Sequence, residues 1–255
     1  MFGKLSSFSK FGLHAILMLF ISGCEGPQGP AGPAGSQPLW IEGYIQISNQ
    51  ALPKGSAYLT VLNCPVIPSV KINDLSIPYN GHGFYTYDLL IAPGQPAELT
   101  VIYTKPDNSQ GFAGASISMP GMFEITSHNP DSTLFLPKGA DLVVAWSASE
   151  HASAYDIYCS VSYRYGDFND STRSGYFSFD TLMSETSITI PARRIFPDIA
   201  EIDTLKRGSG SLYIDAKNGP IYEGDAENVS GDGNGYFIGR TRCDRLYIEV
   251  VDSNQ

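Results

Sequence analysis

The sequence predicts an all-β protein built from two tandem β-sandwich domains, and three observations support this fold class. After residue 36, no segment shows the long helical period of apolar residues that an amphipathic helix requires. Short runs rich in Val, Ile, Thr, Tyr and Phe alternate instead with Gly, Pro, Asn and Asp, which end strands and form turns. The 15 Tyr and 26 Gly residues also fit an all-β composition.

The first domain is expected over residues 38–125, where six or seven short strands follow one another with turn residues between them. This spacing is typical of an Ig-like β-sandwich. Asn73 and Asp74 divide the run 70–77 into a hairpin, because both residue types accept the positive φ of a tight turn. The other expected strands are 40–47, 57–62, 84–90, 98–103 and 113–118.

The second domain is expected over residues 127–253. Leu142, Val144 and Trp146 alternate along its first clear strand, which predicts that all three lie on one buried face. Further strands are expected at 154–159, 212–219 and 246–251. The stretch 190–210 is expected to hold a short helix or an extended loop.

This second domain resembles a fibronectin type III domain. The family's patterns L-x-V-x-W, Y-x-V/I and Y-x-V-x-A-x-N-G are matched here by Leu142, Val144, Trp146, Tyr155, Ile157, Tyr213, Ala216, Asn218 and Gly219. Ile214 and Asp215 depart from the family's usual alternation after the tyrosine. The resemblance implies a binding or spacing module with no catalytic residue.

Residues 1–23 read as a secretory signal peptide. Lys4 and Lys10 precede an apolar stretch, residues 11–21, and no acidic residue interrupts it. The stretch is too short for a transmembrane helix, which needs about 20 apolar residues.

The run Ile21-Ser22-Gly23-Cys24 resembles the lipobox of bacterial lipoproteins. The resemblance implies cleavage between Gly23 and Cys24, a diacylglycerol thioether on Cys24 and an acyl chain such as palmitate on its new amino group. It also implies a lipid-anchored protein of the bacterial cell envelope, in the outer membrane if the cell has one, because Glu25 and not Asp follows the cysteine. The alternative is an ordinary secreted protein with an incidental cysteine.

Residues 24–37 are expected to form a collagen-like tether between the lipid and the first domain. Glycine recurs at positions 26, 29, 32 and 35, each of the first three followed by proline. This Gly-X-Y pattern is too short for a stable triple helix, so we expect a single extended chain reaching roughly 40 Å. The protein is then a monomer, with a trimeric stalk as the alternative.

Charge and motifs limit the remaining functions. A formal net charge of −10 without a basic stripe argues against nucleic-acid binding. No H-E-x-x-H, G-x-S-x-G or Walker motif occurs, and we expect no catalytic residue, no metal site and no cofactor besides the lipid. The expected function is binding of a protein or glycan. The alternatives are an architectural subunit of an envelope assembly and a polysaccharide hydrolase whose paired carboxylates meet only in the fold.

The densest aromatic region supplies the candidate binding surface. Tyr163, Tyr165 and Phe168 fall in one segment, and Tyr176 lies in the segment that answers it. Exposed aromatic rings with polar neighbours can stack on sugars or anchor a protein interface. The alternative is a hairpin whose aromatic side chains pair across the strands and enter the core.

Three cysteines follow the lipidation site. Tyr155, Ile157, Cys159 and Val161 share strand parity, which predicts a buried thiol at Cys159. Counting back from Leu246 places Cys243 on the outward set, which argues against a Cys159–Cys243 disulfide without excluding it. Cys64 is expected to be free.

The Gly- and Asp-rich stretch 223–235 resembles the start of a calcium loop, but without the required later ligands a hairpin loop is expected.

Overall fold

The computed structural model describes residues 37–49, 54–165, 173–196, 205–222 and 225–251. Strands dominate these residues, and the single α-helix among them is the four-residue α1 (Ala192–Ile195), so the all-β class is confirmed. The strands are β1 (Leu39–Ser48), β2 (Lys54–Leu62), β3 (Ser69–Ile72), β4 (Leu75–Ser76), β5 (Phe84–Leu90), β6 (Pro96–Thr104), β7 (Gln110–Ser118), β8 (Leu134–Pro137), β9 (Leu142–Ala145), β10 (Ala154–Tyr165), β11 (Arg173–Met183), β12 (Ser187–Ile190), β13 (Leu205–Asn218), β14 (Ser230–Gly231), β15 (Gly233–Arg242) and β16 (Leu246–Val251).

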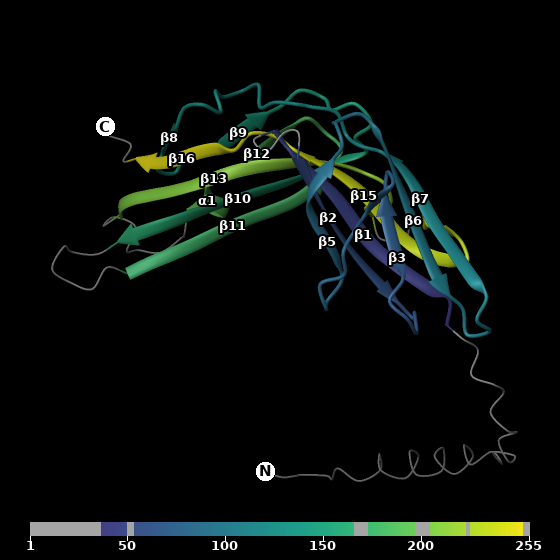
Figure 1. The fold of residues 1–255 in the computed structure, drawn as a ribbon. Coiled ribbons are helices and arrows are strands. Elements are labelled where there is room, and N and C mark those ends of the chain that lie inside the picture. Colours follow the sequence, from purple (N-terminus) through teal and green to yellow (C-terminus); the bar gives the residue numbers. More distant parts are fainter. Residues whose placement is uncertain (1–36, 50–53, 166–172, 197–204, 223–224, 252–255) are drawn as a thin grey trace, which may run out of the picture. The chain divides into compact units, whose positions relative to one another are not determined.

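The largest sheet joins strands from both ends of the sequence. Seven of its strands are hydrogen-bonded in the order β11-β10-β13-β15-β1-β2-β5. The sheet also includes β16, which pairs with β13, and β8, which pairs with β16. Figure 1 shows the yellow β15 beside the purple β1, and these two strands pair in parallel from Leu39↔Gly233 to Ser48↔Arg242. The β1–β15 pair therefore joins the N-terminal strands to the C-terminal ones.

A first hydrophobic core lies between this sheet and a second sheet ordered β14-β7-β6-β3-β4. The large sheet contributes Ile41, Ile45, Leu59 and Phe237, all fully or almost fully buried. The second sheet contributes the alternate side chains Val70, Ile72, Leu99, Val101, Ala113 and Ile117. Burial of each large aliphatic side chain stabilises the fold by about 1.5–3 kcal/mol.

A second core lies around β10, β13 and β16. Leu142, Val144 and Trp146 are all buried in it, as their alternation predicts, and β9 pairs with β12 beside them. Ile195 of the short helix α1 also packs there, so the expected short helix in 190–210 is present. The Trp146 ring meets Tyr155 edge-on, with centroids 5.5 Å apart.

Two strands from the segment 127–253 pair with strands from the segment 38–125. β15 pairs with β1, and β14 pairs with β7. Val229 and Phe237 belong to the first hydrophobic core. Residues 38–255 accordingly form one compact unit, in which the stretch 229–242 completes sheets begun by the N-terminal strands.

The predicted hairpin at 70–77 is confirmed, with Asn73 and Asp74 at φ values of 46° and 65° between β3 and β4. Cys159 is buried and free, also as predicted. The outward placement of Cys243 is wrong, because Cys243 is 2% exposed. It continues the alternation of β15, and the irregular residues 244–245 reset the parity before β16. All three cysteines in the described residues are free thiols.

Candidate functional site

The outward face of β1 is aromatic and polar, whereas its inward face is aliphatic. Ile41, Ile45 and Ile47 point into the core, so Glu42 and Tyr44 point the other way. The same alternation on β2 buries Ala57 and Leu59 and turns Tyr58 and Thr60 outward; on β15 it buries Phe237 and turns Tyr236, Ile238 and Arg240 outward. The solvent face of the large sheet thus collects side chains from strands far apart in sequence.

Strand register aligns three tyrosines, Tyr44, Tyr58 and Tyr85, and Tyr87 stands two residues after Tyr85 on β5; we call these four the tyrosine row. Tyr44 pairs directly with Tyr58, and Tyr58 with Tyr85 on β5. The ring centroids of these pairs lie 6.1 and 6.3 Å apart, and Tyr85 meets Tyr87 edge-on at 4.4 Å. Tyr87, at the end of the row, is 70% exposed. The row presents ring surface across three neighbouring strands.

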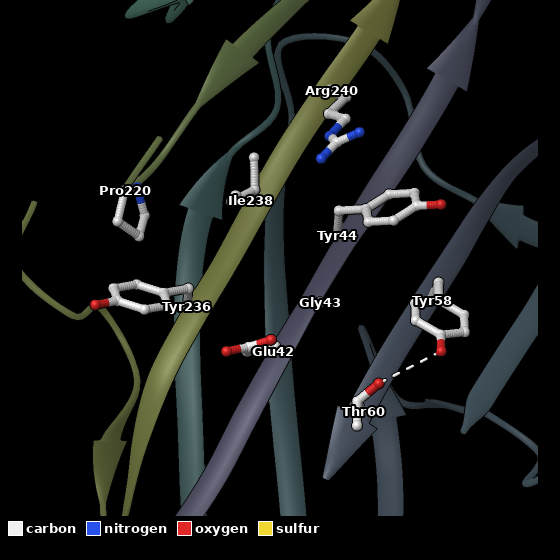
Figure 2. A pocket seen from close by; sticks show the side chains of 9 residues that line it. All are labelled: Glu42, Gly43, Tyr44, Tyr58, Thr60, Pro220, Tyr236, Ile238 and Arg240. Atoms are coloured by element: carbon white, nitrogen blue, oxygen red, sulfur yellow. Dashed lines mark hydrogen bonds between the residues drawn. The ribbon is translucent and has the colours of Figure 1, made fainter. Parts of the chain in front are cut away.

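Arg240 extends the row onto β15. Its guanidinium carbon lies 4.3 Å from the centroid of the Tyr44 ring, a cation–π contact. Figure 2 shows the Tyr44 side chain between Arg240 on one side and Tyr58 on the other. At the start of the same strands, Trp40 meets Tyr236 edge-on at 5.6 Å and donates a 2.7 Å hydrogen bond from Nε1 to Glu42.

These side chains line an open groove of about 410 Å³. Aromatic rings and Ile238 supply apolar surface, while a few polar groups stand at defined positions along it. The lining residues are Glu42, Gly43, Tyr44, Tyr58, Thr60, Pro220, Tyr236, Ile238 and Arg240 (Figure 2). The groove offers aromatic surface for stacking together with hydrogen-bond donors and acceptors.

The Tyr85 hydroxyl of the row stays protonated at neutral pH. Partial removal of the Tyr85 hydroxyl from water and its hydrogen bond with Tyr87 together raise the pKa of Tyr85 to about 12. A neutral phenol can both donate and accept a hydrogen bond. Thr60 Oγ1 lies 3.4 Å from the Tyr58 hydroxyl, so these two groups form a polar pair at the edge of the groove.

A second hollow, of about 510 Å³, lies beyond Pro220, but its polar groups are engaged within the protein. Asn218 Nδ2 donates to the Ser118 carbonyl at 2.8 Å. Asp225 Oδ2 accepts the backbone N–H groups of Ile221 and Tyr222 at 2.7 and 2.8 Å. These contacts brace the segment after β13 and leave the first groove as the stronger candidate site.

The structure does not assemble the binding surface predicted around Tyr163. Tyr163 is 1% exposed, and its hydroxyl donates to the carbonyl of Ile195, so its assignment to an exposed surface is wrong. Tyr176 is 59% exposed, but its hydroxyl pairs with that of Tyr158. Phe168 and the Tyr165 side chain lie outside the described residues. The described part of this hairpin fits the alternative interpretation, in which aromatic side chains pair across the strands and enter the core.

The acidic stretch 223–235 gives no metal cluster in its described part. Asp232 binds Lys105 Nζ at 2.8 Å and accepts the Phe112 N–H at 3.0 Å, which together hold the pKa of its carboxyl below the ordinary value. Among the residues that the structure describes, no three His, Cys, Asp or Glu side chains gather as metal ligands.

The described part of the chain contains no helix long and apolar enough to cross a bilayer. Gly23 and Cys24 lie outside the described residues.

Sequence reasoning missed the tyrosine row, although the signal was present. Trp40, Glu42 and Tyr44 alternate with the aliphatic residues of 40–47, which marks them as outward-facing. Tyr58, Tyr85 and Tyr87 stand at similar positions in two further expected strands. The pairing of β1 with β2 and of β2 with β5 brings these outward positions together.

Comparison with known proteins does not place the chain in a family. No family model matches it, and no curated protein matches it. Among solved structures, it is similar to the Ig1–Ig2 fragment of DIP-gamma, at 9% identity and a TM-score of 0.21, over 82% of this chain and 98% of that one. It is also similar to a Ca²⁺-stabilized adhesin that helps an Antarctic bacterium reach out and bind ice, at 8% identity and a TM-score of 0.20. That match covers 84% of this chain, which spans about half of the adhesin chain (49%).

Proposed function

We propose that this protein is a lipid-anchored binding protein of the bacterial cell envelope, and that the groove on β2, β1 and β15 binds a glycan. Cys24 carries the lipid, and the tether 24–37 holds the β-sheet unit away from the membrane. The bound glycan stacks on the tyrosine row, and the protein performs no chemical step on it. The outer membrane is the expected location in a cell that has one.

The observation that carries this proposal is the tyrosine row. A pyranose ring has an apolar C–H face and a rim of hydroxyl groups, so it binds aromatic rings that have polar groups beside them. Tyr44 and Tyr58 provide the rings, while Glu42, Thr60 and Arg240 provide hydrogen-bonding groups along the same groove. Neighbouring strands space the rings in a row, which suits a ligand built from successive sugar units.

A glycan fits this surface better than a large protein partner. The cores of protein interfaces are depleted in glutamate, yet Glu42 lines this groove. Its volume of about 410 Å³ lies at the lower end of the usual range for small-ligand sites, roughly 300–1,000 Å³.

A glycan array probed with the full chain in detergent tests the binding function. We expect saturable binding that Tyr58→Ala abolishes and Phe112→Ala leaves intact. Phe112 is the matched control because its ring is 52% exposed on β7, in the other sheet. Failure to bind any glycan, or equal loss in both variants, would contradict the proposal. Crosslinked capture of one fixed protein complex without glycan binding would favour an architectural role.

The anchor has a separate test. Cys24→Ala removes the thiol that the lipid requires, so the chain should move from the detergent phase to the aqueous phase in Triton X-114 partitioning. Cys64→Ala is the control, because Cys64 lies within the β-sheet unit and is a free thiol. Unchanged partitioning of the Cys24 variant would show that this residue does not hold the protein at the membrane.

A further inference from the structure

Three basic side chains stand close together on the outer face of β13 and β15, and two of them are neutralised by carboxylates. Lys217 Nζ lies 2.6 Å from Asp156. Arg242 forms a two-pronged pair with Asp215, with Nε and Nη2 donating at 2.6 and 2.8 Å. The strand register places Lys217 opposite Arg240, and Arg242 lies two residues further along β15, so the third cation has both satisfied ones as neighbours.

Arg240 is different, because no described residue supplies a carboxylate to it. Its guanidinium rests on the Tyr44 ring, and its Nε is buried without a hydrogen-bond acceptor among the described residues. The Arg240 side chain lines the groove, whereas Arg242 and Lys217 do not. A guanidinium binds carboxylates strongly through paired N–H donors. The groove therefore contains a preplaced cation that no carboxylate of the described residues neutralises.

We infer that the glycan bound in this groove is acidic and that Arg240 receives its carboxylate, as a hexuronic or sialic acid residue would supply. This inference rests on the proposed function and specifies its ligand class. The carboxylate meets the terminal nitrogens of Arg240, and the ring of the same sugar lies against Tyr44 and Tyr58. The stacked Tyr44 ring also fixes the guanidinium plane, which reduces the ordering that binding requires.

Glu42 defines the opposite end of the groove. Gln46 pairs with Arg240 and Glu42 pairs with Tyr236, so the backbone positions of Glu42 and Arg240 stand four residues apart along parallel strands. Four residues correspond to about 13 Å, and the Arg240 guanidinium lies over Tyr44 within that interval. Glu42 repels a second carboxylate and accepts hydrogen bonds from hydroxyl groups. The site thus suits one acidic sugar at the Arg240 end followed by a neutral sugar toward Glu42.

The net charge of the chain restricts the acidic glycans that the groove would take. At −10, the protein repels a continuous polyanion, while screening limits that repulsion to about 10 Å at 0.1 M salt. A glycan with isolated carboxylates avoids most of this repulsion and still supplies the partner that Arg240 lacks. The expected ligands are therefore glycans in which acidic and neutral sugars alternate or in which one acidic sugar caps a neutral chain.

Matched ligands that differ only in the carboxylate test the inference. The full chain in detergent is titrated with 3′-sialyllactose and with hyaluronan oligosaccharides, each beside its carboxyl-reduced form. In at least one pair, we expect the acidic form to bind about tenfold more tightly than the neutral form, as one charge-assisted contact provides. Arg240→Gln should remove this preference, while Arg245→Gln, which removes an exposed charge outside the groove, should keep it. Thermal melts confirm that both variants are folded.

The outcomes separate this inference from the proposed function. Neutral glycans that bind as tightly as their acidic partners, with dependence on Tyr58, would overturn the role of Arg240 and leave glycan binding intact. An acidic preference that survives in Arg240→Gln would also overturn it. The absence of binding to any member of the two pairs, together with a blank glycan array, would overturn both.

Discussion

The Arg240 guanidinium carbon lies 4.3 Å from the centroid of the Tyr44 ring, and the two residues come from parallel strands at opposite ends of the sequence. This contact exists because β15 pairs with β1. The candidate binding groove therefore depends on a long-range strand pairing, and changes that disturb this pairing should disturb the groove.

Gly235 is the position where that pairing is most sensitive. Its φ is 136°, and a Cβ atom there would lie 1.8 Å from the carbonyl oxygen of Ile41. Gly235→Ala should therefore lower the free energy of unfolding by about 2 kcal/mol or more, measured by urea denaturation. Gly81→Ala is the control, because Gly81 also has a positive φ, 95°, but no atom within 4 Å of its Cβ position. Equal losses in the two variants would contradict close packing at Gly235.

The length of the tyrosine row predicts a dependence on glycan length. Tyr87 lies at the exposed end of the row, beyond Tyr85, and does not line the groove. Tyr87→Ala should weaken binding of a longer oligosaccharide by about fivefold, as expected for about 1 kcal/mol per aromatic contact, and leave a disaccharide unaffected. Calorimetric titrations of one oligosaccharide series measure both effects. A Tyr87→Ala variant that binds every length normally would confine the site to the groove itself.

Asp232 predicts a contribution to stability that is lost in acid. Its hydrogen bonds to Lys105 and to the Phe112 N–H lower the pKa of the carboxyl from 3.8. A carboxyl with a lowered pKa in the folded state stabilises the fold above its ordinary pKa, and this contribution disappears as the pH falls through the folded-state value. The wild-type chain should thus melt at a higher temperature than Asp232→Asn at pH 7, and the gap should narrow as the pH falls below 3.8. A gap of constant size would exclude this linkage.

The three described cysteines should differ in reactivity. Burial raises the pKa of Cys159 and of Cys243 to about 12, and both side chains are about 2% exposed. Cys64 is partly exposed and hydrogen-bonded to the Val66 carbonyl. In the folded protein at pH 8, Ellman's reagent should react with Cys64 and with neither buried thiol. Cys64→Ser should abolish this native reaction, whereas rapid labelling of Cys159 would contradict its burial.

Local sequence patterns predicted many of the strands, because alternating β-branched and aromatic residues carry a strong signal. The expected strand 84–90 coincides with β5, and Asn73-Asp74 forms the expected turn. β15 was missed because Gly233, Gly235 and Gly239 interrupt its alternation and mimic a loop. At Gly235 a glycine is required because the neighbouring strand approaches its backbone closely, and a single sequence does not show such an approach.

The groove could be predicted only in part for a related reason. Alternation identifies the outward side chains of each strand, but it does not say that β15 lies beside β1. Local aromatic density was a misleading signal at Tyr163, although its parity with Tyr155, Ile157 and Cys159 correctly indicated the core. The predicted lipid anchor at Cys24 rests on local sequence alone and stays a prediction.

The central claim is that the tyrosine row is the surface on which a glycan lies. Hydroxyl-radical footprinting of the full chain, with and without a saturating array-identified glycan, tests it most directly. Oxidation of Tyr44, Tyr58 and Tyr85 should fall in the presence of the glycan, while oxidation of Tyr247, which is 51% exposed on β16, should stay unchanged. Unchanged oxidation of the row, with protection elsewhere on the chain, would contradict the account.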